Sequence, residues 1–221
     1  ADYLIDFHTW DQSGAIYLSC GTSDIAYNQY TPTLNGTRTQ VGCTAIAMSQ
    51  LIYFWGEWEN ENDYNLTINS ISFDESDSYT TSQEIQIDDD ASYRDFLNFT
   101  KLDNKLSNIE YDFDPDEIAA LCFGIGVKLH ADYGEDDTGA AYSLSFLQEL
   151  GFSSAKTVYE SDDDGLLTST RIDLEDTLIN NIESGCPVLA SMLNVDDKKA
   201  HAIIIDGYDA TKDQFHFNMG W

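Results

Sequence analysis

Apolar positions are spread unevenly along this chain, and they predict helices over most of its length and strands near its end. Residues 43–55 are mostly apolar and stop at Gly56, which predicts a mostly buried helix beginning at Cys43. Three further segments carry helical spacing and helix-end signals: 116–126, 142–150 and 174–182. Three β-rich runs follow, separated by turns: 187–192, 201–206 and 214–218. Helices followed by strands indicate an α+β fold.

The other segments are polar and rich in turn-forming residues. The first 40 residues, with turn signals such as Asn35-Gly36, are predicted to be an irregular segment. Residues 57–92 are polar and acidic and predict loops and short elements, followed by a short amphipathic piece over 93–102. The sequence contains no internal repeat.

Composition narrows the possible partners. The chain has 42% hydrophobic and 13% aromatic residues, which predicts that it folds. Its 40 acidic and 10 basic residues give a formal net charge of −30, which disfavours nucleic acid and anionic membranes as partners. The charge also suits a saline habitat, although an ordinary solvated surface explains it equally well. No run of about 18 apolar residues is present, and Ala1 begins no signal-peptide pattern, so a soluble, already processed chain is expected.

The four cysteines are too few and too far apart to indicate a disulfide framework or a zinc site. Cys43 opens the predicted helix, and a helix N-terminus stabilises a thiolate, which makes the thiol a better nucleophile. Gly42 before it allows a substrate carbonyl to approach, and the Cys43 amide could donate to an oxyanion. Taken alone, however, a lone cysteine is more often a packing residue.

A candidate base lies far away in the sequence. His201 opens a predicted strand, and Asn218 follows it by seventeen positions, so that a hairpin could bring the amide beside the imidazole. Cys, then His, then Asn is the order of papain-like enzymes. His8, His130 and His216 lack such a context and are predicted to be structural.

Three segments together resemble one family. Residues 39–50, TQVGCTAIAMSQ, resemble the nucleophile segment of the streptopain family, the papain-like cysteine peptidases that bacteria secrete. Residues 201–207, HAIIIDG, are similar to its His segment, and residues 215–221, FHFNMGW, to its Asn segment. Weaker similarity before and between these segments extends the resemblance over almost the whole chain.

The resemblance implies a papain-like, two-lobed α+β fold and a cysteine endopeptidase. Residues 1–221 would form one catalytic domain, with a helical lobe over roughly 1–150 and an antiparallel β lobe over roughly 151–221. The β lobe is expected to be incomplete at its C-terminus, because relatives continue beyond the position of Trp221. The implied partners are protein or peptide substrates and an N-terminal propeptide in a secreted precursor, and no cofactor or metal is expected.

The resemblance also implies roles for individual residues. Cys43 would be the nucleophile, His201 the base and then the acid, and Asn218 the group that orients the imidazole. The family's oxyanion glutamine lies in a W-x-Q pattern that Trp10-Asp11-Gln12 fits, which favours Gln12, while ungapped counting places Ser23 there. The residues expected to bind substrate are Gly42, Gly134, Ala200 and Trp221. Met219 stands where the family commonly has Trp, so the shielding indole is either supplied by Trp221 or missing.

Two other kinds of protein remain open. One is an acidic adhesion or calcium-stabilised binding module, although residues 160–165 resemble only the start of a calcium loop and Arg171 stands where a bidentate Glu is needed. The other is a different Cys-His acyl-transfer enzyme, such as a transglutaminase-like or cell-wall amidase domain. Cys20, Cys122 and Cys186 are expected to be buried thiols, unless one pair of them is oxidised.

Overall fold

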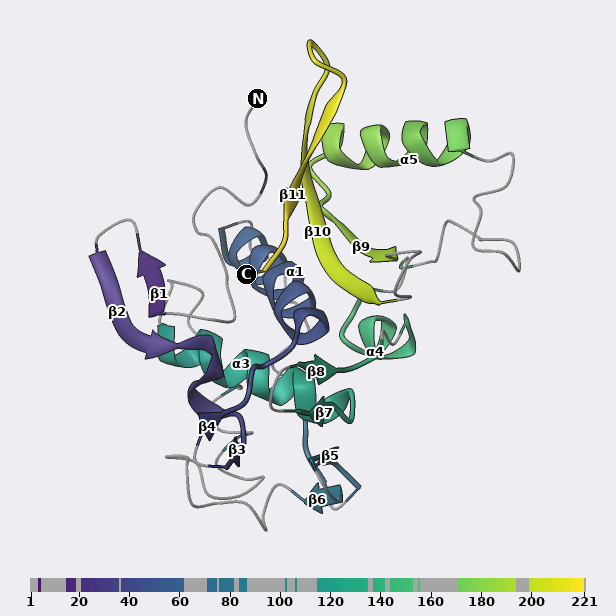
Figure 1. Ribbon diagram of the computed structural model, residues 1–221. Helices are drawn as coiled ribbons and strands as arrows, with labels where there is room; N and C mark the ends of the chain where they lie inside the picture. Colours follow the sequence, from purple (N-terminus) through teal and green to yellow (C-terminus); the bar gives the residue numbers. More distant parts are fainter. Residues whose placement is uncertain are drawn as a thin grey trace.

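Helix α1 (Cys43–Glu61) lies at the centre of the molecule, between a three-stranded sheet and a group of smaller elements (Figure 1). The computed structural model describes these residues: 4, 15–18, 21–35, 37–61, 71–74, 76–81, 84–86, 102, 106, 115–134, 137–141, 144–152, 155, 171–193 and 199–220. The predicted start of the first helix at Cys43 is confirmed. Its predicted end at Gly56 is wrong, because Gly56 is buried and helical, and a glycine ends a helix only when it leaves the helical conformation.

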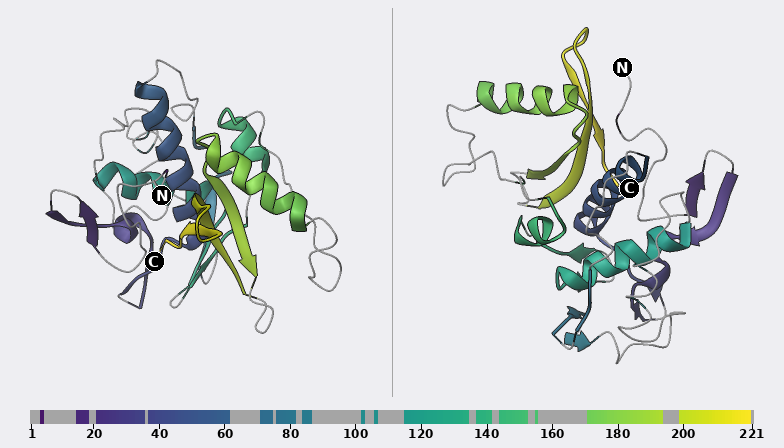
Figure 2. Two further views of the ribbon diagram at one scale, coloured as in Figure 1. Left: turned by 90° about the horizontal axis from the view of Figure 1, so that it is seen from above. Right: turned by 180° about the vertical axis from the view of Figure 1, so that it is seen from behind.

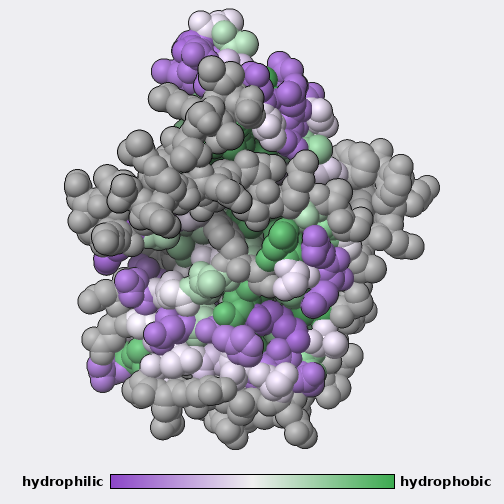
Figure 3. Space-filling view, turned by 90° about the vertical axis from the view of Figure 1, so that its right-hand side faces the viewer, coloured by the Kyte–Doolittle hydropathy of each residue, from purple (hydrophilic) through white to green (hydrophobic). Residues whose placement is uncertain are grey.

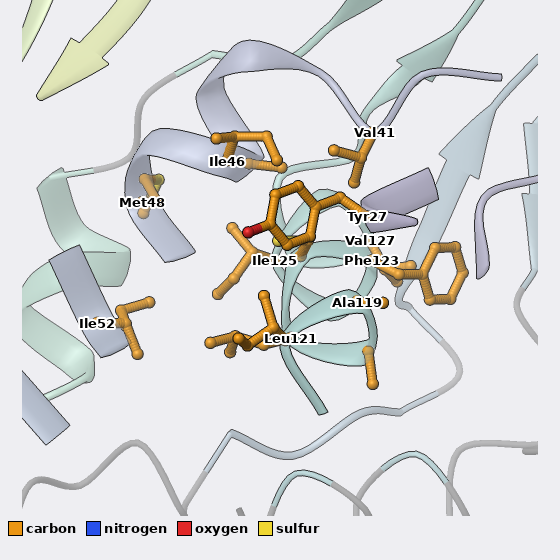
Figure 4. Packing of buried hydrophobic residues seen from close by; sticks show 14 of the residues in the cluster. Tyr27, Val41, Ile46, Met48, Ile52, Ala119, Leu121, Phe123, Ile125 and Val127 are labelled. Carbon is orange, nitrogen blue, oxygen red and sulfur yellow. The ribbon is translucent and has the colours of Figure 1, made fainter. Parts of the chain in front are cut away.

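The main hydrophobic core lies between α1 and α3 (Pro115–Lys128), the helix predicted over 116–126. The 3₁₀ helix η1 (Tyr27–Tyr30) contributes two buried tyrosines to this core. Figure 4 shows the ring of Tyr27 beside Ile46 of α1 and Ile125 of α3. These helices bury many of their apolar side chains against one another. This packing fixes the position of α1 and therefore of its first residue.

The other two predicted helices are also present. They are α4 (Leu144–Glu149) and α5 (Arg171–Glu183). Each is followed by a glycine with positive φ, 104° at Gly151 and 78° at Gly185, as the predicted helix ends require.

The three predicted β-rich runs form one antiparallel sheet in the order β11-β10-β9. Its strands are β9 (Val188–Leu193), β10 (Ala200–Asp209) and β11 (Gln214–Asn218). Helices α1 and α5 cover opposite faces of this sheet (Figures 1 and 2). Alternate side chains of β10 point to opposite faces of the sheet. Ala202 and Ile204 belong to the main core, while Ile203 and Ile205 pack in a second cluster with Ile182 of α5.

The prediction that the first 40 residues are irregular is wrong for much of this segment. Two hairpins lie there: β1 (Ala15–Leu18) with β2 (Gly21–Ala26), and β3 (Thr33–Leu34) with β4 (Thr37–Arg38). The predicted turn at Asn35 is present, since Asn35 has a φ of 50° between β3 and β4. Strands β3 and β4 have two residues each, which is too short for an alternation of apolar and polar residues to be visible in the sequence.

A four-stranded sheet was also not predicted. Its order is β6-β5-β7-β8, and β5 pairs in parallel with β7 through Thr80 and Asp132. Its strands are β5 (Ser78–Thr80), β6 (Glu84–Gln86), β7 (Asp132–Tyr133) and β8 (Thr138–Gly139). The predicted amphipathic piece over 93–102 lies outside the described residues except for Leu102, which is buried. Among the helices that the structure describes, none is both long and apolar enough to cross a membrane. Helices and mainly antiparallel sheets together confirm the α+β class.

Candidate active site

Cys43 is the first residue of α1 and is partly exposed. The residue before it, Gly42, has a φ of 94°, a backbone conformation that residues other than glycine rarely adopt. A Cβ atom on Gly42 would lie 3.1 Å from both Cγ2 and the backbone oxygen of Thr138. Glycine therefore permits both the turn into α1 and the close approach of β8.

The segment 138–140 is fixed beside Cys43 by hydrogen bonds. The Thr138 hydroxyl donates to the Gln40 carbonyl at 2.6 Å, and the Thr44 hydroxyl donates to the Ala140 carbonyl at 2.8 Å. These two hydrogen bonds join the segment to residues on both sides of Cys43. The segment therefore lies along one side of the thiol.

Gly134, a predicted substrate-binding residue, closes the turn before this segment. Its N–H donates to the Asp137 carbonyl at 2.8 Å, and a Cβ atom on Gly134 would lie 2.6 Å from the same oxygen. The Asp137 carboxylate also lies 3.8 Å from the ammonium group of Lys199, the residue before β10. Both side chains of this ion pair are exposed, so it contributes little to stability.

Strand β10 brings the other candidate residue to Cys43. The backbone N–H of Ala202 donates to Cys43 Sγ at 3.5 Å. Ala202 directly follows His201, so the contact places the backbone of the predicted base beside the predicted nucleophile. A backbone N–H that faces sulfur also stabilises a thiolate.

The imidazole of His201 is held by a backbone carbonyl. Its Nε2 atom lies 2.7 Å from the oxygen of Met219. A carbonyl oxygen can only accept, so the neutral ring carries its hydrogen on Nε2 and keeps the lone pair on Nδ1. His201 is thus prepared to accept a proton at Nδ1.

Asn218 lies at the end of β11, opposite Ile204 of β10. Its side-chain oxygen accepts from Gln50 Nε2 at 3.1 Å and from the Gly220 N–H at 3.2 Å. The contact to His201 Nε2 comes from the next residue, through the Met219 carbonyl. The predicted role of Asn218 as the imidazole orienter stays a prediction.

Gln50 is a part of the site that the sequence analysis missed. It lies on α1 seven residues after Cys43, and therefore on the same face two turns later. The signal in the sequence was a polar amide seven residues after Cys43 within a mostly apolar run.

Of the other predicted site residues, only some lie among the residues that the structure describes. Gln12 and Trp221 lie outside the described residues, and Ser23 lies on β2, where the structure describes the backbone and not the side chain. Ala200 is exposed at the first position of β10.

Other cysteines and histidines lie in different surroundings. Cys122 is buried in the main core, and burial raises the pKa of its thiol to about 12. His130 is exposed, with Nδ1 3.2 Å from the Ser78 hydroxyl, while His216 Nδ1 lies 2.5 Å from a buried Asp206 carboxylate oxygen. Within the described part of the chain, no group of three or more His, Cys, Asp or Glu residues could hold a metal ion.

Known proteins resemble the chain in both sequence and fold. The model of the Peptidase C10 family matches residues 22–221. The fold is similar to that of a mutant fragment of Prevotella intermedia prointerpain A, with a TM-score of 0.59, 19% sequence identity, and coverage of 99% of this chain and 63% of that one. It is also similar to active wild-type interpain A cysteine protease from the same organism, with a TM-score of 0.58, 18% identity, and coverage of 99% and 83%. No curated protein matches the sequence.

These comparisons settle the fold and the family. The chain spans less than two thirds of the prointerpain A fragment. At these identities the structural likeness establishes the fold, which is the predicted papain-like α+β fold. The family match confirms the resemblance to the streptopain family. This chain belongs to the Peptidase C10 family.

Proposed function

We propose that the chain hydrolyses peptide bonds, with Cys43 as the nucleophile and His201 as the general base and acid. The observation that carries this proposal is the 3.5 Å hydrogen bond from the Ala202 N–H to Cys43 Sγ. It joins the start of strand β10, where His201 lies, to the start of α1. Cys43 and His201, which are 158 positions apart in the sequence (201 − 43 = 158), therefore lie near each other.

The first half of the reaction follows from the hydrogen positions. Nδ1 of His201 takes the proton of the Cys43 thiol, and the N–H groups at the start of α1 and the Ala202 N–H stabilise the thiolate. The thiolate attacks the peptide carbonyl, and the Cys43 amide donates to the oxyanion. We propose Gln12 as the second oxyanion donor, with Ser23 as the alternative position.

In the second half of the reaction, the proton that His201 took from Cys43 passes to the leaving group. The imidazolium gives its Nδ1 proton to the leaving amine, the C–N bond breaks, and a thioester remains on Cys43. Nδ1 then takes a proton from water, and the resulting hydroxide attacks the thioester. The C–S bond breaks, which releases the acid and restores the Cys43 thiolate beside the protonated imidazole. Throughout these steps the Nε2–H group keeps donating its hydrogen bond to the Met219 carbonyl, so the ring keeps its orientation.

The substrate is proposed to lie along the 138–140 segment. That segment is joined by hydrogen bonds to Gln40 and Thr44, on either side of Cys43, which supports its role as one wall of the cleft. Gly42, Gly134 and Ala200 are the proposed contacts within the described residues, and Trp221 is the proposed shield of the imidazole. We propose Asn218 as a catalytic support that acts beside His201.

We further propose one catalytic domain over residues 1–221, with the helical lobe over roughly 1–150 and the β lobe over roughly 151–221. Family membership supports a bacterial enzyme secreted as a precursor with an N-terminal propeptide, acting on protein or peptide substrates. The name of one structural neighbour, prointerpain A, agrees with such a precursor.

The test is covalent labelling with an epoxide inhibitor of cysteine peptidases, followed by peptide mapping. We expect the adduct on Cys43, and we expect Cys43→Ala to lose at least about a thousandfold in peptide cleavage. Cys186→Ala, which changes another partly exposed thiol, is the control and should cleave normally.

Three outcomes would contradict the proposal. Labelling of Cys122 as fast as Cys43, together with cleavage by Cys43→Ala, would remove Cys43 from the mechanism. Incorporation of an amine without hydrolysis would indicate an acyl-transfer enzyme. Calcium-dependent melting without thiol labelling would indicate the binding module.

A further inference from the structure

Gln50 is a polar side chain in an apolar place. It is 1% exposed and lies on α1 among core residues such as Met48 and Ile52. Its Oε1 atom is buried and has no hydrogen-bond partner among the described residues. An amide buried in this way weakens the fold compared with an apolar side chain of the same size, so stability does not explain why it is there.

Among the described residues, Gln50 has one side-chain hydrogen-bond partner, and it lies on strand β11. Its Nε2 atom donates to Asn218 Oδ1 at 3.1 Å, and the same oxygen accepts from the Gly220 N–H at 3.2 Å. The Gly220 N–H can only donate, so it requires the oxygen of the Asn218 amide on its side. That oxygen in turn requires a donor from Gln50, which fixes both amide orientations.

The Gly220 N–H and the Met219 carbonyl belong to one peptide group. A peptide group is planar, so fixing the direction of its N–H also fixes the direction of its C=O. The Asn218 oxygen holds the N–H side, and His201 Nε2 donates to the C=O side at 2.7 Å. A continuous series of hydrogen bonds therefore leads from Gln50 through Asn218 and this peptide group to the imidazole.

We propose that Gln50 is a positioning residue for His201. By holding Asn218 and the peptide group between Met219 and Gly220, Gln50 keeps the hydrogen of the imidazole on Nε2 and the lone pair on Nδ1. The inference rests on the proposed function, because it concerns the residue that would act as the base. It adds that α1 carries the nucleophile at its first residue and the support for the base two turns later.

The experiment compares Gln50→Met, which has a similar length and no donor, with Ser49→Ala. Ser49 is the neighbouring buried polar residue on α1, and its side chain interacts with Cys122 and not with Asn218. We expect Gln50→Met to keep or raise Tm, to lower kcat/KM for peptide cleavage by about tenfold or more through kcat, and to change the pH profile of kcat/KM. Ser49→Ala should keep the kcat/KM and the pH profile of the wild type.

A spectroscopic measurement separates this inference from the proposed function. The ¹⁵N shifts of the His201 ring report which nitrogen carries the hydrogen, whether or not the chain cleaves peptides. We expect the Nε2–H form in the wild type and a mixture of the two tautomers in Gln50→Met. If the chain cleaves nothing but the tautomer changes, the proposed function fails and the positioning role stands.

Two results would overturn the positioning role. One is an unchanged tautomer and an unchanged pH profile in Gln50→Met. The other comes from a double-mutant cycle with Asn218→Leu: if Gln50 acts through Asn218, the double variant is no worse than Asn218→Leu alone, and additive losses would contradict the inference. Gln50→Leu replaces Gln50→Met in both tests if the latter does not fold.

Discussion

Three free cysteines lie in the described part of the chain, and their surroundings differ. Cys43 is partly exposed at a helix start and accepts a hydrogen bond from the Ala202 N–H. Cys122 is buried in the core, where burial raises the pKa of its thiol to about 12. At neutral pH Cys122 therefore stays a neutral thiol, whereas Cys43 lies at a helix N-terminus and faces a backbone N–H.

The first prediction concerns Cys122 at alkaline pH. The pKa of its thiol is 9.0 ordinarily and about 12 in the folded chain, so its contribution to stability is fully present below pH 9 and is lost as pH rises toward 12. Between about pH 8 and about pH 10.5 this loss amounts to about 2 kcal/mol, at about 1.4 kcal/mol per unit above the ordinary pKa. Urea denaturation at the two pH values should show a smaller loss in Cys122→Ala than in the wild type.

Cys186→Ala is the matched control for this measurement. Its thiol is partly exposed, so the variant should lose as much stability at high pH as the wild type does. Equal losses in the wild type and Cys122→Ala would contradict the assignment to Cys122.

The second prediction concerns Asp206, whose side chain is fully buried and lies 2.5 Å from His216 Nδ1. His216→Ala leaves this carboxylate in the interior without that donor, which should lower the free energy of unfolding by about 1–3 kcal/mol. Chemical denaturation near neutral pH measures the difference. His130→Ala, which changes an exposed histidine, should cost clearly less, and the idea fails if the two variants are equally stable.

Among the elements, the start of α1 is where the fold and the site are most closely connected. Gly42 turns the chain into the helix, and the Gly42 carbonyl accepts from the Ile46 N–H at 3.1 Å. Strand β8 packs against this turn through Thr138. The position of Cys43 therefore depends on the turn as well as on the helix.

The third prediction tests this turn. Gly42→Ala should lower the free energy of unfolding by about 1–2 kcal/mol, because alanine is strained at a φ of 94° and its Cβ atom would lie 3.1 Å from Thr138. Peptide cleavage should fall as well, since relief of the strain moves Cys43. Denaturation curves and kcat/KM measure the two effects.

Gly139→Ala is the control on the neighbouring strand. No atom of the described residues lies within 4 Å of a Cβ atom at Gly139, so the stability of Gly139→Ala should stay within about 0.5 kcal/mol of the wild type. If Gly42→Ala is as stable as Gly139→Ala, the turn does not need a glycine.

At the scale of the whole molecule, the net charge of −30 is the dominant property. Hydrophilic residues occupy much of the described surface in Figure 3, and hydrophobic residues are seen mainly between them. So large an excess of one sign destabilises the compact state through self-repulsion. Salt weakens that repulsion, because the screening length falls from about 10 Å at 0.1 M to about 3 Å at 1 M.

The fourth prediction follows from this screening. Raising NaCl from about 0.1 M to about 1 M should increase Tm by several degrees, as a gain of about 1–2 kcal/mol would in a chain of this size. Thermal melting in NaCl and in KCl separates screening, which both salts provide equally, from binding of one cation. A Tm that is independent of salt would show that the acidic residues are compensated locally.

Much of this protein was determined by the sequence alone. Apolar spacing predicted the helices that became α1, α3, α4 and α5 and the strands that became β9, β10 and β11, because such periods are local properties of the chain. The motifs around Cys43 and His201 were specific enough to indicate the family.

Only the tertiary structure decided how these parts meet. The contact from Ala202 to Cys43, the Met219 carbonyl on His201, and the hydrogen bond from Gln50 to Asn218 join positions far apart in the chain, or use backbone atoms that every residue has. The sheet β6-β5-β7-β8 likewise joins strands of two or three residues that have no readable period. Local spacing predicts elements, whereas long-range packing decides which backbone group faces which side chain, and in this site the backbone groups hold the imidazole.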